Sequence, residues 1–75
     1  MRPEFKKYYQ ILGENVAFYR KRKKLTQEQL AEMVECENIH ISHIETGYRG
    51  SSLDVVFAIA DTLGVEPYKL FQNKD

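Results

Sequence analysis

The chain has 75 residues, which suffices for one small domain with a single hydrophobic core. No apolar run is long enough to cross a membrane and no secretory signal is recognisable, so we expect a cytoplasmic protein without a membrane segment. The single cysteine, Cys36, excludes an internal disulfide, which favours a reducing compartment.

The formal net charge of zero hides an asymmetry along the chain. Residues 1–25 carry eight basic and two acidic side chains, whereas residues 26–75 carry three basic and nine acidic ones. Such polarity can orient a protein on a polyanion, with the basic cluster 20–24 as the attractive end. The alternative is that this cluster is only a solvated helix end, which the helix dipole favours.

The first helix is expected to begin between Glu4 and Tyr8 and to run to about Lys23. Apolar side chains recur there at helical spacing, among them Leu12, Val16 and Tyr19. Gly13 lies inside this helix, at a cost of about 1 kcal/mol relative to alanine.

The middle of the chain has the pattern of two short helices, about 27–34 and 38–45, joined by a tight turn. Thr26 can cap the first of them, and Gln29 completes a capping box. Gly47 suits the left-handed position after the second. The apolar side chains that can face one shared core are Leu25, Leu30, Ala31, Val34, Ile41 and Ile44.

The last third of the chain predicts two further helices. A fourth helix, about 53–63, has Ser52 as its cap and Gly64 as its end, and Pro67 suits the first turn of a short fifth helix. The side chains expected to face inward are Leu53, Val56, Phe57, Ala60, Leu63, Leu70 and Phe71. Because no strand pattern is evident, residues 1–75 are predicted to form one compact all-α domain of five helices.

The chain contains short motifs at the same spacing as those of a known family. They are Leu12-Gly13-Glu14, Arg20, Leu25-Thr26-Gln27-Glu28-Gln29-Leu30-Ala31, Ile41-Ser42, Ile44-Glu45, Gly47, Ser52-Leu53-Asp54, Ala60, Leu63-Gly64-Val65 and Leu70-Phe71. Over about 11–71 the chain resembles the helix-turn-helix family of phage Cro and repressor proteins, also called the XRE or lambda-repressor-like family. The resemblance implies a five-helix DNA-binding domain whose helix-turn-helix unit lies at about 26–46. It implies no cofactor, and it implies that the third helix enters the major groove of double-stranded DNA.

The resemblance places base contacts at Asn38, Ile39 and His43. An asparagine amide can pair with adenine, a histidine can donate to guanine, and an isoleucine can pack on a thymine methyl. Further side chains at the same helix could also touch DNA, namely Glu37, His40 and Ser42. The alternative readings are that Asn38 caps the third helix and that Ile39 contacts the core or a partner protein.

Phosphate contacts are implied for Gln27, Thr46 and Arg49. Gln27 begins the second helix, where backbone N–H groups favour anions, which favours a phosphate contact over the alternative that it is merely a good first-turn residue. Arg20 and Glu45 stand at positions that pair in the family and tie the first helix to the end of the third. Removing one partner of a buried pair costs about 3–5 kcal/mol, because the other charge is left alone.

Several residues depart from the family pattern. Glu35 stands where a glycine is usual, and a left-handed backbone would cost it about 1–2 kcal/mol. Glu37 replaces the usual small cap, and Ser51 replaces a common proline. Residues 26–46 hold five acids and no lysine or arginine, so non-specific affinity for DNA is expected to be low.

Cys36, His40 and His43 have the spacing of one helix face, which raises the question of a metal site. Cys36 occupies a position that the family fills with a small buried apolar side chain, so we expect no metal there. No catalytic constellation or glycine-rich phosphate loop is present, so we do not expect an enzyme.

The sequence therefore predicts a sequence-specific DNA-binding transcriptional regulator of a bacterium or phage. A homodimer would read a pseudo-palindromic operator with half-sites about 34 Å apart, or a multiple of that distance. The dimer surface is expected near Tyr68 and Phe71, with Phe5, Tyr8 and Tyr9 as a second candidate. The rival hypothesis is a protein-interaction module that keeps the fold and has lost DNA binding.

Overall fold

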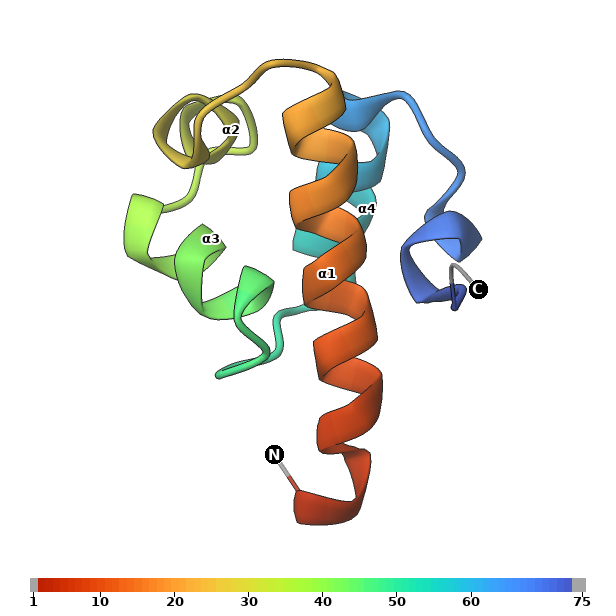
Figure 1. The fold of residues 1–75 in the computed structure, drawn as a ribbon. Helices are drawn as coiled ribbons and strands as arrows, with labels where there is room; N and C mark the ends of the chain where they lie inside the picture. The colour runs from red at the N-terminus through yellow and green to blue at the C-terminus, as the bar shows by residue number, and fades with distance from the viewer. Residues whose placement is uncertain (1, 74–75) are drawn as a thin grey trace.

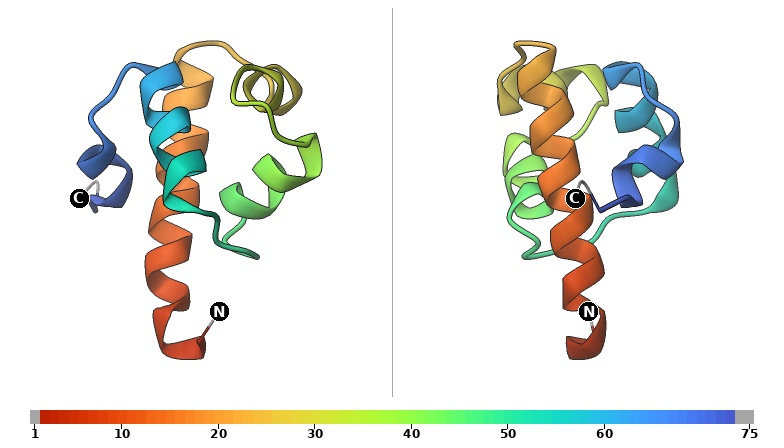
Figure 2. Two further views of the ribbon diagram at one scale, coloured as in Figure 1. Left: turned by 180° about the vertical axis from the view of Figure 1, so that it is seen from behind. Right: turned by 45° about the vertical axis from the view of Figure 1, so that its right-hand side comes forward.

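A computed structural model describes residues 2–73 and shows four α-helices with a 3-10 helix before and after them. Their bounds are η1 Pro3–Phe5, α1 Lys6–Arg22, α2 Gln27–Met33, α3 Asn38–Glu45, α4 Leu53–Leu63 and η2 Pro67–Phe71. The long helix α1 stands in the middle, with α2 and α3 on one side of it and η2 on the other (Figure 1). Figure 2 shows α4 on the back of α1. In residues 2–73 there is no strand, and no helix could span a membrane.

The prediction of an all-α domain is confirmed, but the fifth element is a 3-10 helix and not an α-helix. The segment has only five residues between Glu66 and Gln72, both of which have extended backbones. Lys69 N–H donates to the Glu66 carbonyl over 2.9 Å, which is the i to i+3 bond of a 3-10 turn. Leu70 is nevertheless fully buried, whereas Phe71 is half exposed and not turned inward.

The core lies where α1 to α4 and η2 meet. The predicted core residues of the middle helices are confirmed: Leu30, Ala31, Ile41 and Ile44 are buried, and Leu25 and Val34 pack partly buried against them. Asn15, which is buried in α1, holds η2 in place, because its amide donates to the carbonyls of Leu70 at 2.9 Å and Gln72 at 2.8 Å.

In α4 two of the predicted inward side chains face solvent. Leu53 is 63% exposed and Phe57 is 44% exposed, whereas Ile59, which was not predicted, is fully buried. The helix has one buried stripe, formed by Val56, Ile59, Ala60 and Leu63. Leu53 and Phe57 are four residues apart and form a separate ridge beside that stripe.

Gly13 explains how α1 and α3 come together. A Cβ atom at this position would lie 2.2 Å from the Ile44 carbonyl oxygen and 2.6 Å from that of Glu45. Only glycine therefore allows the end of α3 to rest on α1. Gly13 lowers the helix propensity of α1, but it permits the close approach of α3 to α1.

Candidate nucleic-acid interface

The start of α2 has the predicted capping box. The Thr26 hydroxyl accepts from the Gln29 N–H at 3.0 Å, and the Gln29 side-chain oxygen accepts from the Thr26 N–H at 2.8 Å. These two bonds satisfy backbone donors that a helix start otherwise leaves unpaired. They also fix the entry of the chain into the helix-turn-helix unit.

The turn between α2 and α3 is left-handed at Glu35, whose φ is +60°. This is the position at which the family uses glycine, so the turn keeps its usual shape at a strain cost of about 1–2 kcal/mol. After Glu35, the Cys36 N–H donates to the Ala31 carbonyl at 2.9 Å and closes the end of α2. Gly47 ends α3 with a φ of +74°, as predicted.

The orientation of α3 is set by Ile41 and Ile44, both of which are buried in the core. The opposite side of the helix start is therefore turned to solvent, where Asn38 is exposed and Ile39 is 56% exposed. Because more than half of Ile39 is exposed, Ile39 is not a core residue. The capping reading of Asn38 is wrong as well, because Glu37 is the N-cap residue and makes no side-chain capping bond.

Two further α3 candidates, His40 and His43, contact the loop that follows the helix. The His40 Nε2 lies 2.8 Å from the Ser51 hydroxyl oxygen. The His43 ring lies 4.8 Å from the ring of Tyr48, centroid to centroid. Tyr48 was not predicted as a site residue, since nothing in the sequence indicates that the loop folds back to His43.

The phosphate candidates after α3 lie on the same loop. The Thr46 hydroxyl donates to the carbonyls of Ser42 at 3.1 Å and His43 at 3.3 Å, and Thr46 is exposed. Arg49 is exposed too, with its guanidinium carbon 5.8 Å from the centre of the Tyr48 ring. The loop therefore presents a cation beside the end of α3.

Arg20 and Glu45 form an ion pair between α1 and the end of α3. Arg20 Nε lies 2.6 Å from Glu45 Oε2, and the two side chains are 11% and 6% exposed. Arg20 Nη1 also donates to the Leu25 carbonyl at 2.7 Å. The pair therefore fixes the loop that leads into α2 as well as the two helices.

Gln27 joins this network, because its Nε2 donates to Glu45 Oε1 at 2.9 Å. This contact was not predicted, since it depends on how α3 ends beside the start of α2. An amide nitrogen carries two protons, so one N–H can serve another acceptor. Gln27 is half-buried, so its side chain has limited freedom.

The acids of the helix-turn-helix unit lie on its surface. Glu28, Glu32, Glu35 and Glu37 are all exposed, whereas Glu45 is paired. The basic residues that follow Arg20, at positions 21–24, are also exposed at the end of α1 (Figure 1, orange). The positive charge thus lies beside the start of α2, and the negative charge lies along α2 and the turn.

Within residues 2–73 no group of three or more His, Cys, Asp or Glu side chains could hold a metal ion. Cys36 is half-buried, and burial together with the neighbouring Glu37 carboxylate raises the pKa of its thiol. A protonated thiol is a poor nucleophile and a poor metal ligand. The structure therefore gives Cys36 a packing position against the core.

Together these features define a helix-turn-helix domain of the class found in DNA-binding transcription regulators. The chain belongs to the helix-turn-helix family of the Cro and C1 type, whose family model matches residues 16–70. No curated protein matches the chain by sequence.

Three solved structures illustrate the likeness. The restriction-modification controller protein C.AhdI from Aeromonas hydrophila is 30% identical with a TM-score of 0.80, over 84% of this chain and 96% of that one. A hypothetical transcription factor from Neisseria, NHTF, is 25% identical with a TM-score of 0.85, over 89% of this chain and 77% of that one. The clp gene regulator ClgR from Corynebacterium glutamicum is 22% identical with a TM-score of 0.81, over 84% and 67%, and shows the shared fold.

Proposed function

We propose that this protein is a sequence-specific transcription regulator that binds double-stranded DNA in the cytoplasm, with α3 in the major groove. The observation that carries the proposal is the exposed start of α3 on a helix whose other face is locked in the core by Ile41 and Ile44. A helix can present side chains to bases when it is held rigidly and one of its sides is free of its own domain.

The base contacts are assigned to Asn38, Ile39 and His43. Asn38 and Ile39 stand free at the first turn of α3, where an amide can pair with adenine and a methyl can pack on thymine. His43 lies one turn further on, with its ring against Tyr48. Glu37, His40 and Ser42 flank these side chains; His40 is held by Ser51 and therefore has the more constrained ring.

The phosphate contacts are assigned to Gln27, Thr46 and Arg49. The assignment of Gln27 is supported by its place at the start of α2. It is also supported by its hydrogen bond to Glu45, which orients the amide and uses one of its two N–H groups, so that the other can donate to a phosphate. Thr46 and Arg49 are supported by their exposure after α3. Two such domains would read a pseudo-palindromic operator as a homodimer.

The competing function is a protein-interaction module without DNA binding. It is favoured by the four exposed acids of α2 and the turn, together with the exposed apolar side chains Met33 and Ile39. Acids that face the DNA backbone would repel it, so α1 and Arg49 must supply the attraction in the regulator. The similar controller protein and transcription factor favour the regulator.

Selection of bound sequences from a random DNA pool tests the proposal. The regulator is expected to enrich a motif whose two halves are inverted repeats, with binding that weakens as salt rises. The control is the double variant Asn38→Ala/Ile39→Ala, which alters two exposed side chains and should keep the fold but lose the motif. Failure to enrich any sequence, with a folded protein, would contradict sequence-specific DNA binding and leave the interaction module as the competing function.

A further inference from the structure

The loop between α3 and α4 folds back onto the backbone carbonyl of His43 (Figure 1, green to teal). This carbonyl accepts hydrogen bonds from the loop. The Tyr48 N–H donates over 3.0 Å, the Arg49 N–H over 3.3 Å and the Thr46 hydroxyl over 3.3 Å. Gly47 permits the reversal, because its φ of +74° lies in the left-handed region. The loop is therefore built around the last turn of α3, where one of the proposed base-reading side chains stands.

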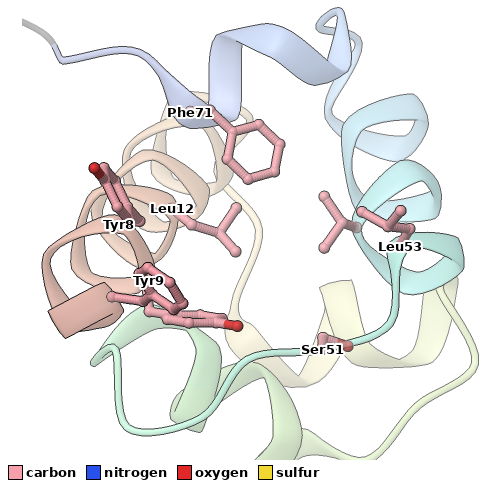
Figure 3. Close-up of a pocket in the computed structure, with 8 residues that line it drawn as sticks. Tyr8, Tyr9, Leu12, Ser51, Leu53 and Phe71 are labelled. Atoms are coloured by element: carbon pink, nitrogen blue, oxygen red, sulfur yellow. The ribbon is translucent and has the colours of Figure 1, made fainter. Parts of the chain in front are cut away.

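Two glycines anchor this loop against α1. A Cβ atom at Gly47 would lie 2.9 Å from Gln10 Cγ, and one at Gly50 would lie 2.3 Å from Tyr9 Cε1. Both distances are too short for a side chain, so both glycine backbones rest directly on α1. Tyr9 of α1 and Ser51 of the loop also line one pocket (Figure 3). The two residues between the glycines are exposed, but the chain is held on either side of them.

Tyr48 is one of these two residues, and its ring contacts His43. Tyr48 is 66% exposed, yet its ring centre lies 4.8 Å from that of His43, with 53° between the ring planes. The Arg49 guanidinium carbon lies 5.8 Å from the centre of the same tyrosine ring. Tilted ring pairs at such distances attract each other, and a cation near a ring face adds to the attraction. The Tyr48 ring is therefore a fixed wall that limits the orientations open to the His43 ring.

The two histidines of α3 are held in different ways. The His40 Nε2 lies 2.8 Å from the Ser51 hydroxyl oxygen, so this nitrogen is engaged within the domain. In the part of the chain that the structure describes, His43 makes a ring contact and no side-chain hydrogen bond. The His43 ring is thus oriented by packing, while its nitrogens are available to an external donor or acceptor.

We propose that Tyr48 is a positioning residue for base recognition, which holds the His43 ring in the orientation that reads its base pair. The inference rests on the proposed function and deepens it, because it names a residue outside α3 on which the specificity of α3 depends. A side chain that is oriented before binding loses less entropy on binding and discriminates more sharply between bases. Without the tyrosine ring, His43 could turn to acceptors on neighbouring bases.

Proton NMR of the free protein tests the ring contact. The ring current of Tyr48 should displace the signals of the His43 ring protons from those of a histidine peptide. Tyr48→Ala should remove this displacement and Tyr48→Phe should keep it, since phenylalanine retains the ring. Met33→Ala is the matched control, because Met33 on α2 is 57% exposed and lies outside the loop. A displacement that survives in Tyr48→Ala would overturn the proposal.

Binding titrations on single-base variants of the selected operator test the effect on recognition. The base pair that His43 reads is the one at which His43→Ala relaxes the preference. Tyr48→Ala should flatten the preference at this same base pair by about fivefold or more, because a mismatch at a contacted base pair usually weakens binding about 5- to 150-fold. Tyr48→Phe and Met33→Ala should bind like the wild type. A uniform loss of affinity in Tyr48→Ala, with every base preference kept, would overturn the positioning role.

The double variant His43→Ala/Tyr48→Ala separates positioning from a direct contact of Tyr48 with DNA. If Tyr48 acts through His43, its removal should change the base preference no further once His43 is alanine. Additive changes in preference would show that Tyr48 reads DNA by itself and would overturn the proposal. Thermal unfolding of each variant verifies the fold, which an exposed side chain such as Tyr48 should alter little.

The outcomes separate this inference from the proposed function. A wild type that selects a motif, together with a Tyr48→Ala variant that keeps every base preference, rejects the inference and keeps the regulator. A wild type that shows the ring contact by NMR but selects no motif rejects the regulator, and the role in base recognition is rejected with it.

Discussion

The guanidinium of Arg20 meets the carboxylate of Glu45 through two hydrogen bonds, from Nε to Oε2 at 2.6 Å and from Nη2 to Oε1 at 3.1 Å. Such a two-point, charge-assisted contact fixes distance and angle together. It joins α1 to the end of α3 and therefore sets how the exposed start of α3 stands on the domain.

Removing either partner of this pair should destabilise the fold strongly. Arg20→Ala and Glu45→Ala are each expected to cost about 3–5 kcal/mol, because the remaining charge is nearly buried and loses its partner. The double variant should lose less than the sum of the two, as measured by urea unfolding in a double-mutant cycle. Additive losses would mean that the pair contributes no coupling energy.

Gly13→Ala gives a test in which two effects have opposite signs. Helix propensity alone predicts a gain of about 1 kcal/mol, whereas the contact with the Ile44 carbonyl predicts a loss of about 1–3 kcal/mol or more from overpacking. We expect a lower melting temperature, because the blocking atoms are backbone and cannot move aside easily. Glu14→Ala, at the exposed neighbouring position, is the control and should change little. A more stable Gly13→Ala variant would show that the Ile44 carbonyl does not approach α1 this closely.

Relief of the left-handed strain at Glu35 should stabilise the domain. Glu35→Gly removes a cost of about 1–2 kcal/mol, part of which the greater chain entropy of glycine offsets, so the expected net gain is about 1 kcal/mol. Glu35→Ala is the control, because alanine meets the same penalty at a φ of +60° and should give no gain. Chemical denaturation measures both, and an equal gain for the two variants would assign the effect to charge instead of backbone.

The raised thiol pKa of Cys36 predicts slow alkylation. Burial and the Glu37 carboxylate both disfavour the thiolate, so at pH 8 iodoacetamide should react more slowly with Cys36 than with a free cysteine peptide. The rate should rise as the pH increases, since the thiolate is the reacting form. Glu37→Gln removes the smaller cause and should speed the reaction modestly, whereas a rate equal to that of the peptide would contradict the raised pKa.

Local signals in the sequence predicted local structure well. The capping box at Thr26 and Gln29 and the left-handed Gly47 depend on residues a few positions apart, so the pattern alone indicates them. The helix pairing through Gly13 was not predicted, because its partner carbonyls are about thirty residues away in the chain. Helix propensity predicts only that Gly13 destabilises α1, and it does not indicate the contact with the end of α3 that requires a glycine.

The candidate site was predicted by resemblance more than by pattern. Its positions on α3 follow from a helix whose buried side is apolar, so the exposure of Asn38 and Ile39 could be expected. The contacts of Tyr48 with His43 and of Gln27 with Glu45 could not, since both depend on the path of a loop or on the meeting of two helix ends. The same limit applies to Leu53, which the apolar pattern placed inside and the structure leaves 63% exposed on α4.

The proposed roles of Gln27, Arg49 and Asn38 separate by their effects on DNA binding. Asn38→Ala should relax the preference at one base position, worth about 1–3 kcal/mol of discrimination, because a bidentate amide is lost. Gln27→Ala should weaken binding to all sequences alike and leave the salt dependence unchanged, since a neutral donor displaces no counterion. Arg49→Ala should also act on all sequences, but should reduce the slope of log K against log salt by about 0.9. Binding titrations on the selected operator and on a scrambled duplex, at several salt concentrations, measure all three. A change of preferred sequence in Gln27→Ala, or an unchanged salt slope in Arg49→Ala, would show that the assignment of bases and phosphates to these residues is wrong.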